Sequence, residues 1–185
     1  QKIETMEIRG ARKIAKTAAE ALKEVAENCE AENSTQLIDE LDQAGKILLD
    51  TRPSAVSLSN SVRFVTRDLD SSEELEDLRE LAITRANDFI DRANEAKEKI
   101  GEIGCRRISD GDVIMTHCNS SNALSVIKTA YDNGKDIEVI ATEARPRRQG
   151  YITIRELSEH GIPVTLIVDS AARHFMKEVD KVIVG

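Results

Sequence analysis

The spacing of hydrophobic residues differs between the two halves of the chain. In the first half they recur every three or four positions, the period of an amphipathic helix. One such face is formed by Ile8, Ala11, Ile14, Ala18, Ala21, Leu22 and Val25. The same period predicts a second helix capped by Ser34 and a third over about 55–68. A long fourth helix is predicted to open at a Ser71/Glu74 capping box and to end near Gly101 or Gly104.

The second half contains four short apolar runs, at 112–117, 137–143, 163–169 and 181–185. Between the first three lie helical patterns at 121–133 and 152–160, followed by glycines where helix C-caps belong, Gly134 and Gly161. Alternation of strands and helices predicts a parallel sheet with right-handed crossovers. The fold class is therefore α/β, with an N-terminal helical domain at 1–108 and a Rossmann-like parallel sheet domain at 109–185. No helix follows the last run, so the second domain is expected to be truncated at its C-terminus.

Composition narrows the classes of function. The net charge is −8 and only 3% of residues are aromatic, whereas nucleic-acid binders normally carry a basic surface. No apolar run reaches the roughly 18 residues of a membrane span. Three cysteines lie far apart in the sequence, at Cys29, Cys105 and Cys118, which is typical of reduced thiols. We therefore expect a cytoplasmic protein that binds neither nucleic acid nor membrane.

Candidate chemistry gathers at the ends of the predicted strands, where open parallel sheets bind their ligands. The first strand ends in 117–120, a histidine, a cysteine, an asparagine and a serine. The second ends in 142–145 and is followed by 147–149, which adds two arginines and a glutamine. The third ends in Asp169 and Ser170, with Arg173 and His174 next. A thiol, a carboxylate, hydroxyls and arginines are therefore expected around one crevice, without a glycine-rich dinucleotide motif or a P-loop.

Each of these candidates also has a purely structural interpretation. Cys118 could be a small buried hydrophobe, but a thiol beside a helix N-terminus is favoured as a thiolate, which can act as a base. Ser120, Ser121 and Asp169 could be helix N-caps. The arginine-rich loop could be solvated or could clamp an anion. No third ligand completes a metal site around His117 and His174.

Several motifs resemble one known family. They are "MEIRGARKIAKTAAEAL" near the start, "TRPSAVSLSNSV" at 51–62, "THCNSSNALSVIKTAYDNGKDIEVIATEARPRRQG" at 116–150 and "GIPVTLIVDSAARHFMKEVDKVIVG" at 161–185. They are similar to archaeal ribose-1,5-bisphosphate isomerases. That family belongs to a superfamily with methylthioribose-1-phosphate isomerase and the translation initiation factor 2B alpha, beta and delta subunits. The resemblance implies conversion of ribose 1,5-bisphosphate to ribulose 1,5-bisphosphate in archaeal nucleoside monophosphate degradation.

The family's functional residues carry over by motif. The resemblance implies that Cys118 is the catalytic base and that Asp169, with its pKa raised by burial, is the general acid. The residues implied to contact phosphate are Arg9, Gly10, Ala11, Arg52 and Ser120. No metal or redox cofactor is implied. A sugar bisphosphate, a nucleotide activator such as AMP and further copies of the chain are the implied partners.

Two departures from the family pattern affect loop shape, because Ala144 replaces a threonine and Ser59 stands where proline is expected. The family's later acidic GAD and NKIGT-like segments are not in this sequence, so a fragment that is inactive alone is expected. One alternative is a non-catalytic regulatory subunit of the initiation factor 2B type, which would not need both Cys118 and Asp169. The other is methylthioribose-1-phosphate isomerase, whose cysteine has a GCNTG-like context rather than HCNSS.

Overall fold

The computed structural model describes residues 3–5 and 7–185. The chain forms two compact units, of which the first extends to Asn94 and the second runs from Glu95 to Gly185. The predicted α/β class is confirmed, with helices first and a parallel sheet after them. The domain boundary near residue 108 remains a prediction. None of the helices among the described residues is long and apolar enough to cross a membrane.

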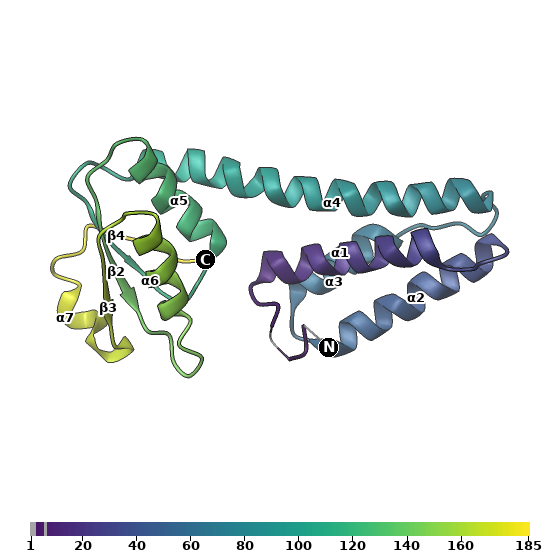
Figure 1. Cartoon of the computed structure of the whole chain (residues 1–185), viewed down its shortest axis with the longest axis horizontal. Helices are drawn as coiled ribbons and strands as arrows, with labels where there is room; N and C mark the ends of the chain where they lie inside the picture. The colour runs from purple at the N-terminus through teal and green to yellow at the C-terminus, as the bar shows by residue number, and fades with distance from the viewer. Residues whose placement is uncertain (1–2, 6) are drawn as a thin grey trace. The chain divides into compact units, whose positions relative to one another are not determined.

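Four helices occupy the first half, as the hydrophobic spacing predicts: α1 (Ala11–Asn28), α2 (Ser34–Thr51), α3 (Val56–Thr66) and α4 (Leu75–Gly104), which continues into the second unit (Figure 1). Their apolar faces form one aliphatic core. Small side chains are frequent in it, which lets neighbouring helices approach closely. The fully buried alanines of this core are Ala18, Ala19, Ala26, Ala82 and Ala86.

Two predicted helix starts are wrong in detail. The cap of α2 is Asn33, whose side chain accepts the N–H of Gln36 at 3.0 Å, while the Ser34 hydroxyl donates to the carbonyl of Glu73 at 2.7 Å. The capping box predicted for α4 does not form, because the Asp70 carboxylate accepts the N–H of Ser72 in a turn that precedes the helix. Both differences come from polar side chains with competing backbone partners.

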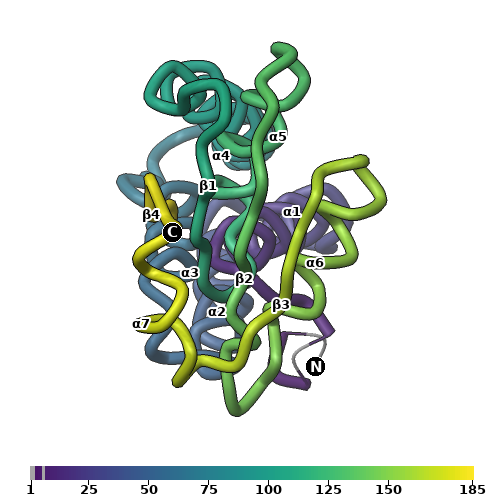
Figure 2. Tube along the Cα trace, turned by 90° about the vertical axis from the view of Figure 1, so that its left-hand side faces the viewer, coloured from purple at the N-terminus to yellow at the C-terminus, as the bar shows by residue number. Residues whose placement is uncertain are grey.

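The second unit is built on a four-stranded parallel sheet in the order β3-β2-β1-β4 (Figure 2). The strands are β1 (Val113–Thr116), β2 (Glu138–Thr142), β3 (Val164–Ile167) and β4 (Lys181–Val182). The connecting helices are α5 (Ser121–Asp132), α6 (Gly150–Glu159) and the short α7 (Ala172–Phe175), with 3₁₀ turns at Cys105–Arg107 and Asp169–Ala171. Gly134 and Gly161 have φ of 81° and 87°, which confirms their predicted places after α5 and α6.

Alternate residues of each strand face opposite sides of the sheet. Ile114 and Val139 pack in the core that contains Leu124 and Leu157 of α5 and α6. Met115, Ile140 and Ile167 pack on the other face, in a cluster with Phe175 of α7. Both faces of this parallel sheet therefore contact helices, as such sheets require.

An ion pair attaches β4 to the start of β1. The Asp112 carboxylate accepts Lys181 Nζ and the Ser109 N–H, both at 2.6 Å. Burial acts to raise the pKa of Asp112, but Lys181 and the Ser109 N–H outweigh it and hold the pKa below its ordinary value. The short strand β4 is thereby fixed beside β1.

The close approach of α6 to the end of β2 depends on Gly150. A Cβ on Gly150 would lie 1.9 Å from the carbonyl oxygen of Thr142 and 2.9 Å from Glu143 Cα. We expect Gly150→Ala to lower the free energy of unfolding by about 3 kcal/mol, because backbone atoms must move to admit the methyl group. Urea unfolding measures this change.

The matched control is Gly45→Ala in α2, where the added Cβ meets only Val62 Cγ1 at 2.9 Å. A side-chain methyl can shift, and alanine gains about 1 kcal/mol over glycine in a helix interior, so we expect a small net effect. Equal losses in the free energy of unfolding for the two substitutions would show that the close contact between Gly150 and β2 does not determine the cost of the added methyl group.

Candidate active site

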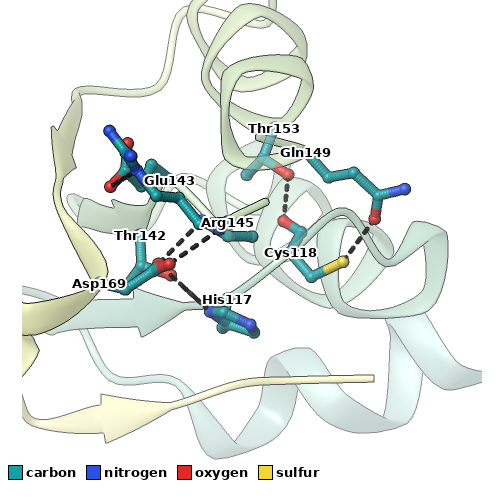
Figure 3. Close-up of polar contacts among 9 residues, drawn as sticks. His117, Cys118, Thr142, Glu143, Arg145, Gln149, Thr153 and Asp169 are labelled. Atoms are coloured by element: carbon teal, nitrogen blue, oxygen red, sulfur yellow. Dashed lines mark hydrogen bonds and ion pairs between the residues drawn. The ribbon is translucent and has the colours of Figure 1, made fainter. Parts of the chain in front are cut away.

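The polar residues predicted to surround a crevice gather at the carboxyl ends of β1, β2 and β3 (Figure 3). The chain proceeds from β1 outward to β3 and then returns to place β4 on the other side of β1, so the sheet has a topological switch point between β1 and β4. Ligands of open α/β sheets bind at such points. The segment after β4 passes the start of α5 there, since a Cβ on Gly185 would lie 2.0 Å from Ser120 Oγ.

Three non-glycine residues around this crevice have left-handed backbone conformations. Cys118 has φ 67°, Ala144 has φ 58° and Arg148 has φ 53°. Such conformations are uncommon for residues with a Cβ and concentrate at functional sites, where surrounding contacts maintain them. Their clustering in the loops after β1 and β2 supports a functional role for this edge of the sheet.

The backbone and the thiol of Cys118 are each held by a side chain near the start of α6. Thr153 Oγ1 donates to the Cys118 carbonyl at 2.7 Å, and the thiol donates to Gln149 Oε1 at 2.6 Å (Figure 3). Asn119 Nδ2 donates to the same Thr153 hydroxyl at 3.1 Å. Cys118 is half-buried with a polar partner, so it is not the buried hydrophobe that its residue type also allowed.

Ser120 is the N-cap of α5, because its Oγ accepts the N–H of Ala123 at 3.3 Å. The structural interpretation of this serine is therefore confirmed. Its contact with a phosphate group remains a prediction.

The carboxylate of Asp169 holds the loop after β2. Its Oδ1 accepts the N–H of Ala144 and its Oδ2 accepts the N–H of Arg145, both at 2.8 Å. These two bonds, with further contributions from the Thr142 hydroxyl and the nearby His117, lower the pKa of Asp169 from its ordinary value despite partial desolvation. The expectation that burial raises this pKa is wrong, because the side chain is 36% exposed and its ionised form is hydrogen-bonded.

His117 lies beside this carboxylate. Its Nδ1 is 2.5 Å from Thr142 Oγ1 and 4.0 Å from Asp169 Oδ1 (Figure 3). Two charged side chains close by, Arg145 and Glu143, are paired with each other, since Arg145 Nε donates to the buried Glu143 Oε1 at 2.8 Å. From the sequence, His117 is only a weak candidate for a site residue at the end of the first predicted strand, and Thr142 has no predicted role. The signal that connects His117 with Thr142 is the proximity of the carboxyl ends of β1 and β2.

The remaining predicted site residues belong to the first unit. Arg9, Gly10 and Ala11 stand at the start of α1, where Gly10 has φ 86° and is the N-cap. Arg52 is the C-cap of α2. Because α1 and α2 are consecutive and antiparallel, both motifs lie at the same end of the helical unit (Figure 1). The structure thus brings these four residues to one end of their unit, and their part in a site with Cys118 and Asp169 remains a prediction.

The fold and the strand-end residues define a helical unit followed by a Rossmann-like sheet with polar residues at the carboxyl ends of β1, β2 and β3. Residues 7–185 match the model of the initiation factor 2 subunit family, and the chain belongs to that family. The resemblance seen in the sequence motifs is therefore confirmed.

The chain is similar to three proteins of this family and its structural relatives. It is 56% identical to the ribose 1,5-bisphosphate isomerase of Pyrococcus furiosus, over 100% of this chain and 58% of that protein. The crystal structure of a translation initiation factor eIF-2B from Pyrococcus horikoshii has a TM-score of 0.87 and 34% identity, covering 100% of this chain and 63% of the other. The 5-methylthioribose 1-phosphate isomerase of Pyrococcus horikoshii has a TM-score of 0.85 and 29% identity, covering 100% and 55%. The chain spans less than two thirds of the length of each.

The lowered pKa of Asp169 predicts a pH-dependent contribution to stability. A carboxyl group whose pKa is depressed on folding stabilises the protein above its unfolded pKa, about 3.9 for aspartate, and the contribution is lost as the pH falls through the folded pKa. Asp169→Asn should therefore be less stable than the parent at neutral pH. The difference should shrink as the pH is lowered below about 4.

Urea unfolding, together with amide hydrogen exchange in the second unit, measures the difference in stability between Asp169→Asn and the parent at each pH. Asp136→Asn is the control, because it makes the same change of charge at an exposed aspartate in the same unit. A gap for Asp169→Asn that stays constant down to acidic pH would contradict the role of its carboxylate as an acceptor of two N–H groups.

Proposed function

We propose that the protein is an aldose–ketose isomerase that converts ribose 1,5-bisphosphate to ribulose 1,5-bisphosphate. The observation that carries this proposal is the pairing of a half-buried thiol on the β1 loop with a carboxylate on the β3 loop, at one edge of the sheet. The 56% identity to a ribose 1,5-bisphosphate isomerase, over the whole of this chain, supports the choice of substrate.

The proposed reaction has to open a sugar ring whose anomeric oxygen carries phosphate. Cys118, as thiolate, removes the proton from C2 while the bond between C1 and the ring oxygen breaks, and Asp169 gives a proton to that oxygen. A C1–C2 double bond forms. The proton taken by Cys118 is then returned to C1 as the C2 hydroxyl gives its own proton to solvent, which leaves the ketone, and Asp169 takes up a new proton before the next cycle. Paired acid and base groups of this kind contribute about 10²–10⁴-fold each to a rate.

Two phosphate groups need cationic or N–H partners. Arg9 precedes the N-cap of the 18-residue helix α1, and Arg52 is the C-cap of α2, whose end lies at the same end of the helical unit as the start of α1. A helix N-terminus attracts anions through its free N–H groups and its dipole, and arginine binds phosphate in a fork geometry. We assign one phosphate to this group and the other to Ser120 at the start of α5.

The lowered pKa of Asp169 adds a requirement to this mechanism, because a general acid must hold a proton when the substrate reacts. Negative charge brought close to a carboxylate raises its pKa. The phosphates of the bound substrate therefore favour protonation of Asp169 in the complex, although the ligand-free site holds it ionised.

The proposal also includes the location of the protein, its oligomeric state and its activator. The three free cysteines support a cytoplasmic location, since thiols persist in reducing compartments. A homo-oligomer and activation by a nucleotide such as AMP are inferred from the resemblance of the motifs to the isomerase family. The net charge of −8 argues against nucleic acid as a partner.

An assay with ribose 1,5-bisphosphate, on the chain alone and on the chain extended to the length of its isomerase relatives, tests the proposal, with methylthioribose 1-phosphate as the competing substrate. We expect Cys118→Ser to retain binding of the bisphosphate but to lose turnover by about 10²-fold or more, because a serine hydroxyl is too weak an acid to serve as the base. Cys29→Ser, in the first unit, is the matched control. Turnover of the Cys118→Ser variant at the parent rate would exclude the thiol as base.

A regulatory subunit would bind a sugar phosphate without converting it, so binding with no turnover of either substrate would favour that alternative. Turnover of methylthioribose 1-phosphate alone would favour the other isomerase.

The arginines give a separate prediction. Arg9→Ala and Arg52→Ala should each raise KM by about tenfold or more, because a hydrogen bond to a charged group contributes about 1.5–3 kcal/mol. Their melting temperatures should stay near that of the parent. Arg63→Ala, at an exposed arginine of α3, serves as the control. A large loss of melting temperature with an unchanged KM would show that the two arginines stabilise the fold instead.

A further inference from the structure

The strand ends bring together His117, Thr142 and Asp169, a group that the proposed reaction does not yet use. His117 Nδ1 lies 2.5 Å from Thr142 Oγ1 and 4.0 Å from Asp169 Oδ1, and the Thr142 hydroxyl contributes as a hydrogen-bond donor to the lowered pKa of Asp169. His117 comes from the β1 loop, Thr142 from the last residue of β2 and Asp169 from the end of β3. Three neighbouring strands thus each contribute one group to a single line of contacts (Figure 3).

The direction of these hydrogen bonds follows from the number of protons available. A threonine hydroxyl has one proton to donate, and an ionised carboxylate can only accept. Since Asp169 is held in its ionised form by the Ala144 and Arg145 N–H groups, the Thr142 proton points to Asp169. The hydroxyl oxygen must then accept from His117, which requires a proton on Nδ1.

We propose that His117 is a proton-transfer residue that supplies Asp169 through the hydroxyl of Thr142. This inference rests on the proposed function for the use of that proton. In the transfer, the proton on Nδ1 of an imidazolium passes to Thr142 Oγ1 as the hydroxyl proton passes to Asp169 Oδ1. The imidazolium becomes a neutral imidazole with its proton on Nε2, the carboxylate becomes a carboxylic acid, and threonine is unchanged.

The surrounding groups are compatible with this transfer. The Glu143 carboxylate is buried and paired with the Arg145 guanidinium, and Arg145 reaches Asp169 only through its backbone N–H. Cys118 is adjacent to His117 in sequence, but its thiol is bonded to Gln149. The imidazole is 56% exposed, so the neutral ring can take up a proton from solvent at Nδ1 after each transfer.

The proton positions can be tested on the chain itself by nitrogen-15 NMR, because the sequence contains only three histidines. At about pH 8, above the range in which histidine usually titrates, we expect the neutral His117 ring to carry its proton on Nδ1. His160 is an internal control with the opposite expectation, since its Nε2 lies 2.7 Å from Asp132 Oδ1. Thr142→Val should abolish the Nδ1–H preference of His117, and Thr142→Ser should retain it.

Kinetics test the use of the proton. His117→Ala should lower kcat by about 10²-fold with little change in KM, and added imidazole should restore part of the rate. Thr142→Val should lower kcat similarly without rescue by imidazole, while Thr142→Ser should stay close to the parent. His160→Gln should be unaffected.

The outcomes separate this proposal from the assignment of the substrate. If the parent chain does not convert ribose 1,5-bisphosphate, that result counts against the proposed function alone, and the NMR spectra still decide whether the line of protons exists. A His117 ring protonated on Nε2 at about pH 8 overturns the proposal. Parent-like kcat in an active His117→Ala variant overturns it as well.

Discussion

The backbone at the end of β2 is held from two directions, and the rest of the site depends on this constraint. The Asp169 carboxylate at the end of β3 accepts two consecutive N–H groups, those of Ala144 and Arg145. On the other side, Gly150 packs against the Thr142 carbonyl so closely that no side chain fits. The loop that follows β2 and ends at Gly150 therefore has little conformational freedom. This constraint allows Ala144 to keep a left-handed conformation. Gln149 and Thr153, which hold Cys118, are positioned by the helix that follows this loop.

The constraint links the two candidate catalytic residues through the backbone of one loop. Asp169 fixes the start of the loop, and α6 at its far end contacts Cys118 through the thiol and the carbonyl. Carboxylate and thiol thus belong to one hydrogen-bonded arrangement even though 51 positions separate them in the sequence, 169 minus 118. A change at either end of the loop is expected to alter both.

Most of the fold could be predicted from the sequence because periodicity reports which face of an element is buried. The alternation of apolar runs and helical patterns placed all four strands and the helices α5 and α6, and Gly134 and Gly161 marked two helix ends. Helix starts were less predictable. Asn33, Ser34, Ser71 and Asp70 all have side chains that can bond to nearby N–H groups, and only the three-dimensional partners decide which one does.

The residues of the candidate site could be selected from the sequence, but their protonation could not. The position of Asp169 after a strand is visible in the pattern of residues. Its pKa depends on the N–H groups of Ala144 and Arg145, which are 25 and 24 positions away. Likewise, nothing in the sequence around His117 shows that Thr142 will lie beside its Nδ1. Long-range contacts between loops determine these properties, and local patterns do not contain them.

In the site proposed for a phosphorylated ligand, the Asp169 carboxylate would couple binding to protonation. The whole chain has a net charge of −8, and Asp169 adds its own negative charge where the proposed substrate would place another. Repulsion between the two is relieved when the carboxyl group takes up a proton, so an anionic ligand and a proton favour each other's binding. The same protonation converts Asp169 from a hydrogen-bond acceptor into an acid. The N–H groups of Ala144 and Arg145, which favour the ionised form of Asp169, would then restrict the acidic form to the complex in which it is needed.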